Sequence, residues 1–407
     1  MSTPPEILAP AGNLEKLEFA VMYGADAVYI GGQAYGLRAY AGNFSYDDMA
    51  KGIAFAHQRG VRVYVTANII PHNQDLAGLP AHVEKVASLG ADALIVADPG
   101  VLRMAREVAP DLEFHLSTQA SNTNWAAAQF WADQGVDRII LAREVSLEDV
   151  GEAVNRVPQL GFEVFVHGAM CVSYSGRCLL SNYLAGRDAN RGACAGPCRW
   201  EYYLVEQKRP GRYFNITEDR HGTYIFNSRD LCMIEHVPAV VDTGVTSLKI
   251  EGRMKSVNYV ASVVKVYRDA VDAYCDNPDT YTYQPSWLEE LQKTSHRGFT
   301  TGFYFNPPGP DDHDYRSSGY QRDYDFVGVV RSYDRGRGLA LVEQRNKIET
   351  GEALEITGPR TSSFPLTVTA LYDEDYDIIE AAPHPQQLFY LPVEREVEPY
   401  ALVRRPS

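Results

Sequence analysis

Cysteines are the residues of this chain whose spacing points most directly to chemistry. Five of the six fall in one segment: Cys171, Cys178, Cys194, Cys198 and Cys232. In a reducing compartment such a cluster predicts a metal or cluster site before a disulfide framework. Zinc prefers cysteines separated by about two to four residues, which only Cys194 and Cys198 approach, whereas a [4Fe–4S] cluster suits widely spaced thiolates at least as well. Reduced buried thiols are the remaining interpretation, and the one we expect for the separate Cys275.

The same segment is locally basic, although the whole chain has a formal net charge of -15. From position 171 to position 232 it holds nine arginines and lysines against six acidic residues, with aromatic residues interleaved. Basic side chains hold phosphates and aromatic faces stack on unpaired bases, so the segment is compatible with binding of a single-stranded nucleic acid. Arg177, Arg191 and Arg199 are candidate substrate-binding residues. Packing of the aromatic residues against the rest of the protein is the alternative.

Polar side chains at the ends of predicted strands form a second candidate site. They are Asn68, Asp98, Gln119, Glu144, His167 and Glu251, and the two amides among them are candidate substrate ligands. His167 and Glu251 are candidates for proton transfer, with a hydrogen-bonded histidine and a Glu251–Arg253 pair as the alternatives. Arg38, Arg143 and Arg253 also follow predicted strands. Their guanidinium groups suit a small dicarboxylate, although surface ion pairing is the ordinary role of such residues.

The elements that would position these residues are eight short, nearly continuous apolar runs, as expected for parallel strands buried on both faces. They are Glu6–Ala9, Ala27–Gly31, Arg62–Ala67, Ala93–Ala97, Glu113–Ser117, Arg138–Ala142, Glu163–His167 and Ser247–Glu251. Helix-length segments separate them, and a glycine suited to a helix end precedes most strands, at positions 24, 60, 90, 135, 161 and 244. This repeat predicts a (β/α)8 TIM-like barrel, with a doubly wound sheet as the alternative.

Two interruptions of the repeat define the predicted domain organisation. The barrel pattern extends over residues 1–320 and is broken between the seventh and eighth strands by a Cys-rich insertion at 171–238. Barrel active sites are built on the face where such an insertion would lie. From 325 to 407, short strand-like runs separated by turns predict a small antiparallel β-barrel domain: Phe326–Ser332, Gly338–Val342, Ala353–Ile356, Pro365–Tyr372 and Tyr376–Ala381. This part has no cysteine, so we expect a packing or recognition role there.

Composition excludes some classes of protein. The acidic balance argues against a protein coated in basic surface for nonspecific nucleic-acid binding. No stretch approaches the ~18 uninterrupted apolar residues that a membrane span needs. The N-terminal residues, Met-Ser-Thr-Pro-Pro-Glu, have neither the basic nor the apolar region of a secretory leader. We therefore expect a cytoplasmic protein without a membrane association.

The segment around the first two cysteines resembles a family signature. Residues 163–181 read Glu-Val-Phe-Val-His-Gly-Ala-Met-Cys-Val-Ser-Tyr-Ser-Gly-Arg-Cys-Leu-Leu-Ser, which is similar to the collagenase-like peptidase family U32, whose catalytic type is unknown. Further similar segments are Leu8–Gly12, Gly24–Gly31, Asn190–Cys194, Phe226–Cys232, Lys249–Arg253 and His296–Gly302. The resemblance covers nearly the whole chain, the small C-terminal domain included.

The resemblance implies an activity that the name of the family does not state. Several members are oxygen-independent hydroxylation proteins that hold a [4Fe–4S] cluster. This chain looks most like the branch that converts the wobble uridine of tRNA to 5-hydroxyuridine, which implies the tRNA anticodon region as partner. By position in the motif, the implied cluster ligands are Cys171, Cys178, Cys194 and Cys232, with Cys198 as the alternative ligand. Prephenate, a small dicarboxylate, is implied as co-substrate.

Two other functions are compatible with these residues. A peptidase would need a nucleophile and a base, for which Cys171 and His167 are the candidates. A thiol protease, however, needs one activated cysteine rather than five clustered ones, and the sequence lacks the His-Glu-x-x-His and Gly-x-Ser-x-Gly hydrolase motifs. A noncatalytic RNA-binding protein with a structural zinc is the third hypothesis.

Overall fold

Eight parallel strands form a closed barrel in the computed structural model, which describes residues 4–37, 42–171, 173–174, 177–200, 218–219, 222–223, 228–306 and 320–407. The strands are β1 (Glu6–Pro10), β2 (Ala27–Gly31), β3 (Arg62–Ala67), β4 (Ala93–Val96), β5 (Glu113–Leu116), β6 (Arg138–Ile140), β7 (Gly161–Gly168) and β11 (Ser247–Ile250). Neighbours pair in chain order, and β11 pairs with both β1 and β7. Because the ring closes, the predicted TIM-like barrel is confirmed and the open doubly wound sheet is excluded.

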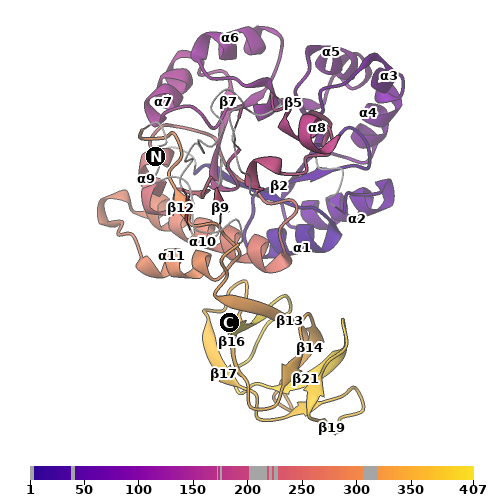
Figure 1. The fold of residues 1–407 in the computed structure, drawn as a ribbon, viewed down its shortest axis with the longest axis vertical. Helices are drawn as coiled ribbons and strands as arrows, with labels where there is room; N and C mark the ends of the chain where they lie inside the picture. Colours follow the sequence, from indigo (N-terminus) through magenta and orange to yellow (C-terminus); the bar gives the residue numbers. More distant parts are fainter. Residues whose placement is uncertain are drawn as a thin grey trace, which may run out of the picture.

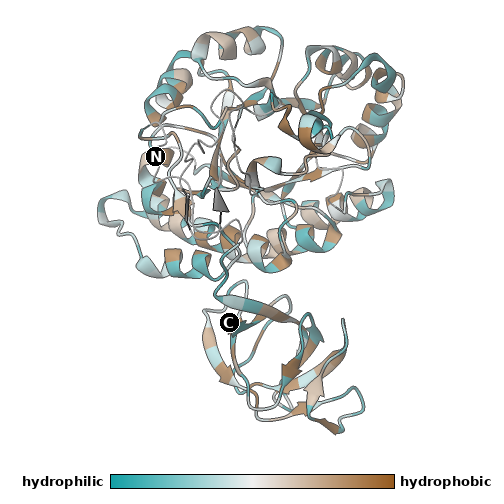
Figure 2. Ribbon diagram, viewed as in Figure 1, coloured by the Kyte–Doolittle hydropathy of each residue, from teal (hydrophilic) through white to brown (hydrophobic). Residues whose placement is uncertain are grey.

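A ring of helices surrounds the barrel strands (Figure 1). It includes α1 (Leu14–Met22), α2 (Tyr46–His57), α4 (Leu79–Ser88), α5 (Pro99–Val108), α6 (Trp125–Asp133), α7 (Leu147–Arg156) and α10 (Val257–Asp276). Several begin at a polar residue whose side chain accepts a backbone N–H of the first turn, as Asn13 and Ser45 do. Figure 2 shows both hydrophilic and hydrophobic residues on these helices, as expected when one face is buried. No helix in the described ranges is both long enough and apolar enough to cross a membrane.

Glycines end most of these helices. Positive φ angles, which glycine adopts without strain, occur at Gly24, Gly60, Gly90, Gly135 and Gly244. Gly161 differs from the prediction, because it is the first residue of β7 and belongs to the strand. The glycine repeat that suggested the barrel therefore marks real helix ends at five of its six positions.

The Cys-rich insertion contains a strand that the sequence analysis did not predict. β10 (Asp230–Cys232) pairs antiparallel with the end of β7, with Leu231 opposite Gly168 and Cys232 opposite His167. β12 (Phe299–Thr300) then pairs with β10 and extends the sheet beyond the ring. Strands of two or three residues are too short to show an alternating pattern, which is why β10 and β12 were missed.

A curled antiparallel sheet forms the C-terminal part of the chain. Its strands are β13 (Tyr324–Asp334), β14 (Leu339–Gln344), β16 (Ala353–Thr357), β17 (Phe364–Thr367), β18 (Leu371–Tyr372), β19 (Ile378–Ile379), β21 (Leu388–Pro392) and β22 (Leu402–Pro406). The sheet encloses its own apolar core, separate from the barrel core. The predicted run Pro365–Tyr372 is divided between β17 and β18, and β21 and β22 were not predicted.

Buried polar contacts hold the C-terminal sheet against α10 and α11 (Pro285–Gln292), the neighbours seen in Figure 1. Arg404 on β22 is fully buried and makes a two-point contact with Glu290 at 2.5 and 3.1 Å. Its guanidinium also donates to Glu355 at 2.6 Å. On the α1 side, the Tyr23 hydroxyl donates to the carbonyl of Tyr400 at 2.9 Å. Arg404 thus joins a carboxylate of the barrel helices to one of the sheet, which fixes the orientation between the two parts.

Candidate active site

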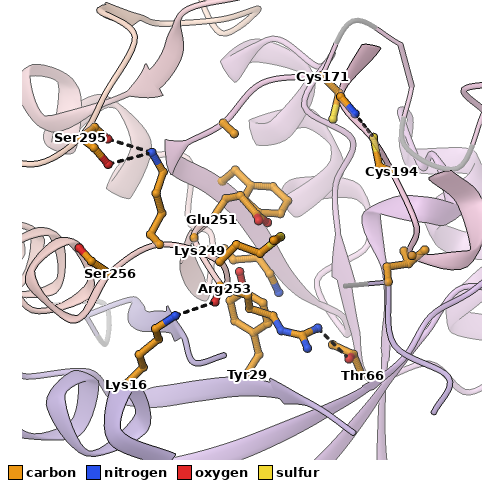
Figure 3. A pocket seen from close by; sticks show the side chains of 18 of the residues that line it. Lys16, Tyr29, Thr66, Cys171, Cys194, Lys249, Glu251, Arg253, Ser256 and Ser295 are labelled. Atoms are coloured by element: carbon orange, nitrogen blue, oxygen red, sulfur yellow. Dashed lines mark hydrogen bonds between the residues drawn. The ribbon is translucent and has the colours of Figure 1, made fainter. Parts of the chain in front are cut away.

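A cavity of about 1000 Å³ opens at the carboxyl ends of the barrel strands. Tyr29 of β2, Thr66 of β3 and Phe165 of β7 are among its barrel residues, and residues that follow the strands complete the mouth (Figure 3). The opposite wall comes from the chain that leads into the C-terminal sheet and from the sheet itself, with Arg322 and Phe326 as examples. Active sites of TIM barrels lie at this face, so the cavity is the candidate active site.

The lining of this cavity is strongly cationic. Its basic residues are Lys16, Arg143, Arg187, Lys249, Arg253, Lys255, Lys293, Arg322 and Arg345. Among the described residues that line it, Glu15 and Glu251 are the acidic ones. In a chain with a net charge of -15, this arrangement concentrates positive charge at one place. The cavity therefore attracts anionic ligands.

A buried ion network lies inside the barrel and ends at the cavity. Lys249, which lines the cavity, places its Nζ 2.7 Å from Glu163, and Arg138 lies 3.3 Å from the other oxygen of Glu163. Arg138 also reaches Glu6 at 2.7 Å, to which Tyr64 donates at 2.6 Å. Burial alone would raise the pKa of Glu163, but Lys249 and Arg138 outweigh burial and the pKa is lowered. Glu163 therefore stays ionised within the barrel.

Arg143 lies between an acid and a thiol at the barrel mouth. Its Nη2 is 3.7 Å from Glu251, and its Nη1 donates to the carbonyl of Ala169 at 3.1 Å. The guanidinium stacks over Phe165, 4.0 Å from the ring centroid, and Nη1 approaches Cys171 Sγ at 3.9 Å. Arg143 therefore links the acidic and the thiol side of the barrel mouth.

Arg253 is held deep in the mouth by contacts that require a glycine beside it. Its guanidinium donates to Asn43 at 2.6 Å and to Thr66 at 3.4 Å. A Cβ at Gly31 would overlap this guanidinium, so only glycine leaves room for it. Lys16 donates to the Arg253 carbonyl at 3.5 Å (Figure 3). Burial, and to a lesser extent the charge of Arg253, lowers the pKa of Lys16.

One serine holds the Asn68 side chain and the Gln119 backbone at the mouth. Asn68 Nδ2 donates to Ser117 Oγ at 3.0 Å, and the backbone N–H of Gln119 donates to the same oxygen at 3.3 Å. All three residues line the cavity. Asn68 Oδ1 and Gln119 Oε1 are buried without a hydrogen-bond partner in the described part of the chain, and so is Arg143 Nε. Buried polar atoms in proteins are nearly always paired, so these atoms are candidate ligand contacts.

Four of the clustered cysteines line the cavity: Cys171, Cys178, Cys194 and Cys198. In the view of Figure 3, Cys171 and Cys194 lie on the same side of the pocket. Cys232 does not line it but is buried on β10, with its Sγ 4.0 Å from the Tyr267 hydroxyl. Burial raises the pKa of Cys232 to about 12. Within the described ranges, no three metal-ligating side chains are already grouped as they would be around an ion.

His167 lies outside the cavity lining. It is 1% exposed and packs against the rings of Tyr259, Tyr267 and Phe299. Its Nδ1 is 3.5 Å from the Tyr267 hydroxyl. Burial, with a smaller contribution from nearby basic groups, lowers the pKa of His167 to about 3, so the ring is neutral. This position favours the alternative given for His167 in the sequence analysis, a hydrogen-bonded histidine, over a role in proton transfer.

The other predicted site residues divide between the cavity and other positions. Asn68, Gln119, Arg143, Glu251 and Arg253 line the cavity. Arg191 pairs instead with Asp75 at 2.8 Å, and Asp98 caps the first turn of α5. Arg177 and Glu144 do not belong to the lining. Arg38 and the side chain of Arg199 lie outside the described residues.

Sequence reasoning missed two parts of the cavity. Lys249 lies within β11, where it passed as a strand residue, although a charge inside an apolar strand was a signal because it needs a buried partner. The second part is the wall that the C-terminal region contributes, including Tyr320, Tyr324 and Asn346. That wall depends on how the sheet docks on the barrel, and no local sequence pattern reports such docking.

Comparisons with known proteins find one matching family and several relatives that are similar along most of the chain. Residues 12–314 match the family described as "Peptidase family U32", and residues 322–404 match its C-terminal domain. "tRNA hydroxylation protein P1" of Bacillus subtilis is 43% identical over 401 residues, covering 98% of this chain and 94% of the relative. "tRNA hydroxylation protein P" of Escherichia coli is 38% identical, covering 98% and 96%. The "23S rRNA 5-hydroxycytidine C2501 synthase" of Escherichia coli is 36% identical, covering 73% and 45%.

Proposed function

This chain belongs to peptidase family U32, and on that premise we propose that it is a tRNA-modifying enzyme that converts the wobble uridine to 5-hydroxyuridine. Relatives that match along 98% of the chain are named as tRNA hydroxylation proteins, and a more distant one is named for a hydroxylated nucleotide of ribosomal RNA. The observation that carries the proposal is a cationic cavity, lined by four thiols, at the active-site face of the barrel. Positive charge gathered in one cavity of an acidic protein suits an anionic substrate.

RNA is the anionic substrate that the surroundings of the cavity favour. The phosphates of RNA pair with lysines and arginines, and its unpaired bases stack on exposed aromatic rings. Tyr183 is 88% exposed, and Tyr174 and Trp200 in the same Cys-rich insertion are also exposed. Exposed rings beside a cationic cavity suit a single-stranded loop, in which bases are already unstacked. A double helix would offer them no free base face.

The thiols at the cavity fit a [4Fe–4S] cluster in number and kind. When bound, such a cluster supplies one-electron redox chemistry. The family motif assigns it to Cys171, Cys178, Cys194 and Cys232. The cavity lining offers Cys198 as the fourth thiol instead, because Cys232 is buried on β10 and does not line the cavity.

Single-cysteine variants purified without oxygen decide the fourth ligand. Loss of iron, sulfide and visible absorption in Cys232→Ala, with Cys198→Ala unchanged, assigns Cys232. The reverse result assigns Cys198. A colourless wild-type protein that holds one zinc would contradict the cluster and favour the structural-zinc hypothesis.

The implied co-substrate prephenate is a dicarboxylate, and the mouth offers cations for it. Arg143, Lys249 and Arg253 are held deep in the cavity by buried contacts. A bound carboxylate would compete there with Glu251, which pairs with Arg143 at 3.7 Å. We assign proton transfer to Glu251 rather than to His167, because Glu251 lines the cavity and His167 does not. A Glu251→Gln variant tests this assignment, since it keeps the size of the side chain and removes the carboxylate.

Nucleoside analysis of tRNA from a deletion strain tests the proposed function. We expect 5-hydroxyuridine derivatives to disappear and to return with the wild-type gene. Cys178→Ala should fail to restore them, whereas Cys275→Ala, which removes a thiol outside the Cys-rich insertion, should restore them. Unchanged tRNA nucleosides in the deletion strain would contradict the proposal, and an altered ribosomal RNA would redirect it.

No observation in the site favours proteolysis. The nucleophile and base of a thiol protease lie within hydrogen-bonding reach of each other. Here Cys171 lines the cavity beside Arg143, while His167 is buried among aromatic rings. The family name therefore receives no support from the arrangement of these two residues.

A further inference from the structure

We propose that Asn68 and Gln119 form a subsite that reads the imide edge of the target pyrimidine by accepting its N3–H. This inference rests on the proposed function, since it names how the same cavity would choose its base. It concerns recognition and assigns no chemical step to either amide.

The two amides come from neighbouring parts of the barrel mouth and are held in place before any ligand binds. Asn68 follows β3, and Gln119 lies in the short helix Thr118–Ala120 that follows β5. Ser117 Oγ accepts from the Asn68 side chain and from the Gln119 backbone, which ties the two residues to one atom. Gln119 is buried to more than nine-tenths of its surface. Its side chain therefore loses little freedom when a ligand arrives.

The atoms left over are acceptors. Asn68 Oδ1 and Gln119 Oε1 have no partner in the described part of the chain, although both are buried and both residues line the cavity. The phosphodiesters of RNA and ionised carboxylates carry no N–H or O–H at neutral pH, so they cannot satisfy these oxygens. The cations of the lining serve the anionic parts of a ligand, and the amides are left for a neutral donor. A nucleobase is a ligand that combines phosphate with such a donor.

Uracil fits this pattern through its imide edge. In a nucleotide its single N–H is at N3, flanked by two carbonyl oxygens. N3–H offers a proton to an amide oxygen, and the flanking carbonyls accept from donors such as Arg143 Nε, which is also buried, unpartnered and at the cavity. Cytosine has an acceptor at N3 and would place it against the amide oxygens. Opposed acceptors repel, so the subsite should prefer uridine.

The rest of the cavity can receive a base turned out of its stack. The rings of Tyr29 and Phe165 line it, with Lys249 4.3 Å from the centroid of Tyr29 and Arg143 4.0 Å from that of Phe165. Enzymes that modify a base in this way commonly stack it on aromatic side chains and read its edge by hydrogen bonds. The planar guanidinium of Arg143, stacked on Phe165, gives a base a surface to stack on beside the two amides.

A short RNA hairpin with one loop uridine tests the subsite by binding and by turnover. Its affinity for wild-type protein is measured without oxygen by fluorescence anisotropy, against hairpins that carry 3-methyluridine or cytidine at the same place. We expect both replacements to weaken binding by about 10- to 100-fold, the loss typical of one buried hydrogen bond. Equal affinity for uridine and 3-methyluridine would overturn the inference, because water alone would then satisfy the amides.

A protein substitution combined with the base modification gives a double-mutant cycle. Gln119→Met removes the acceptor at nearly the same volume, and Gln159→Met, an exposed glutamine away from the cavity, is the matched control. Gln119→Met should bind the uridine hairpin more weakly than wild type does. It should bind the 3-methyluridine hairpin as well as wild type does, because that base has no N3–H to lose. Gln159→Met should match wild type with both hairpins. Losses that multiply would overturn the inference. A folding defect in the variant would leave the wild-type comparison of hairpins decisive.

Different results would contradict the subsite and the proposed function. If wild-type protein discriminates N3-methylation in binding but never hydroxylates the uridine, the proposed function fails and the subsite stands. If it hydroxylates uridine and tolerates N3-methylation equally well, the subsite fails and the proposed function stands.

Discussion

The two ends of the barrel interior treat polar groups in opposite ways. Toward the amino ends of the strands, Arg138 bridges the half-buried Glu6 and the fully buried Glu163 at 2.7 and 3.3 Å. At the carboxyl ends, Asn68 and Gln119 lie at the mouth, and each has a buried side-chain oxygen with no partner among the residues that the structure describes. The first end satisfies its charges within the chain, and the second leaves acceptors open toward a cavity. We infer that paired polar groups here serve stability and that unpaired ones serve a ligand.

Removal of Arg138 should cause the largest loss of stability among the substitutions that distinguish the two ends of the barrel. Arg138→Leu leaves the half-buried Glu6 without its cation and the buried Glu163 with Lys249 alone, so we expect a loss of about 3 kcal/mol in the free energy of unfolding. Urea unfolding followed by circular dichroism measures it. Arg143→Leu, at the mouth, should cost clearly less stability because its partner Glu251 is 3.7 Å away and partly exposed. Equal losses in the two variants would break the distinction between the two ends.

Substitution of Gly31 should come next. In Gly31→Ala the added methyl group would overlap the Arg253 guanidinium and displace it from Asn43 and Thr66. We expect a loss of about 1 to 3 kcal/mol in stability, as for other overpacked sites, together with loss of activity. Gly151→Ala is the control, because a Cβ there meets no atom within 4 Å and lies in α7. A fully active Gly31→Ala variant would show that the position of Arg253 is not needed.

The buried His167 should make the free energy of unfolding depend on pH. The pKa of His167 is about 3 in the folded chain, against about 6.5 when unfolded. Between these values the unfolded chain binds the extra proton, so stability falls as the pH drops below about 6.5. From pH 7 to pH 5 we expect His167 to account for about 2 kcal/mol of this loss.

Parallel unfolding titrations of wild type and His167→Gln measure that contribution. The variant should lose less stability over the same pH range, whatever its stability at pH 7. Identical pH slopes would mean that His167 is accessible to protons in the folded chain, contrary to its burial.

The smallest effect should come from the wall that the C-terminal region contributes. Arg322 lines the cavity and its side chain is 62% exposed. Arg322→Ala should weaken binding of the RNA hairpin only a few-fold and lower the slope of log affinity against log salt by about one. Arg335→Ala, an exposed arginine of the same sheet that does not line the cavity, should leave both unchanged. Matching losses in the two variants would assign the effect to overall charge.

The fold was largely predictable because its signal is local and repeated. Parallel strands buried on both faces gave near-continuous apolar runs, and helix ends gave glycines with positive φ. β10 and β12 were not predictable, since each takes its pairing from a distant strand rather than from its own two or three residues. The strands β21 and β22 were missed for a related reason, as their partners lie far along the chain.

The candidate site was predictable where it follows from strand ends. Asn68, Gln119 and Arg143 were found because every barrel strand delivers its last residues to one face. Lys249 was missed because it lies within a strand, and Arg322 because its place depends on docking of the sheet. His167 is an exception to this rule. It lies near the end of β7, but β10 pairs with β7 at this position and His167 is buried.

The pairing of β10 with β7 has a consequence for how this protein can vary. Gly168, where the chain leaves β7, lies opposite Leu231, where it returns. The chain thus leaves the barrel sheet and returns to it at adjacent points. A change in the length of the insertion therefore need not alter the ring of barrel strands.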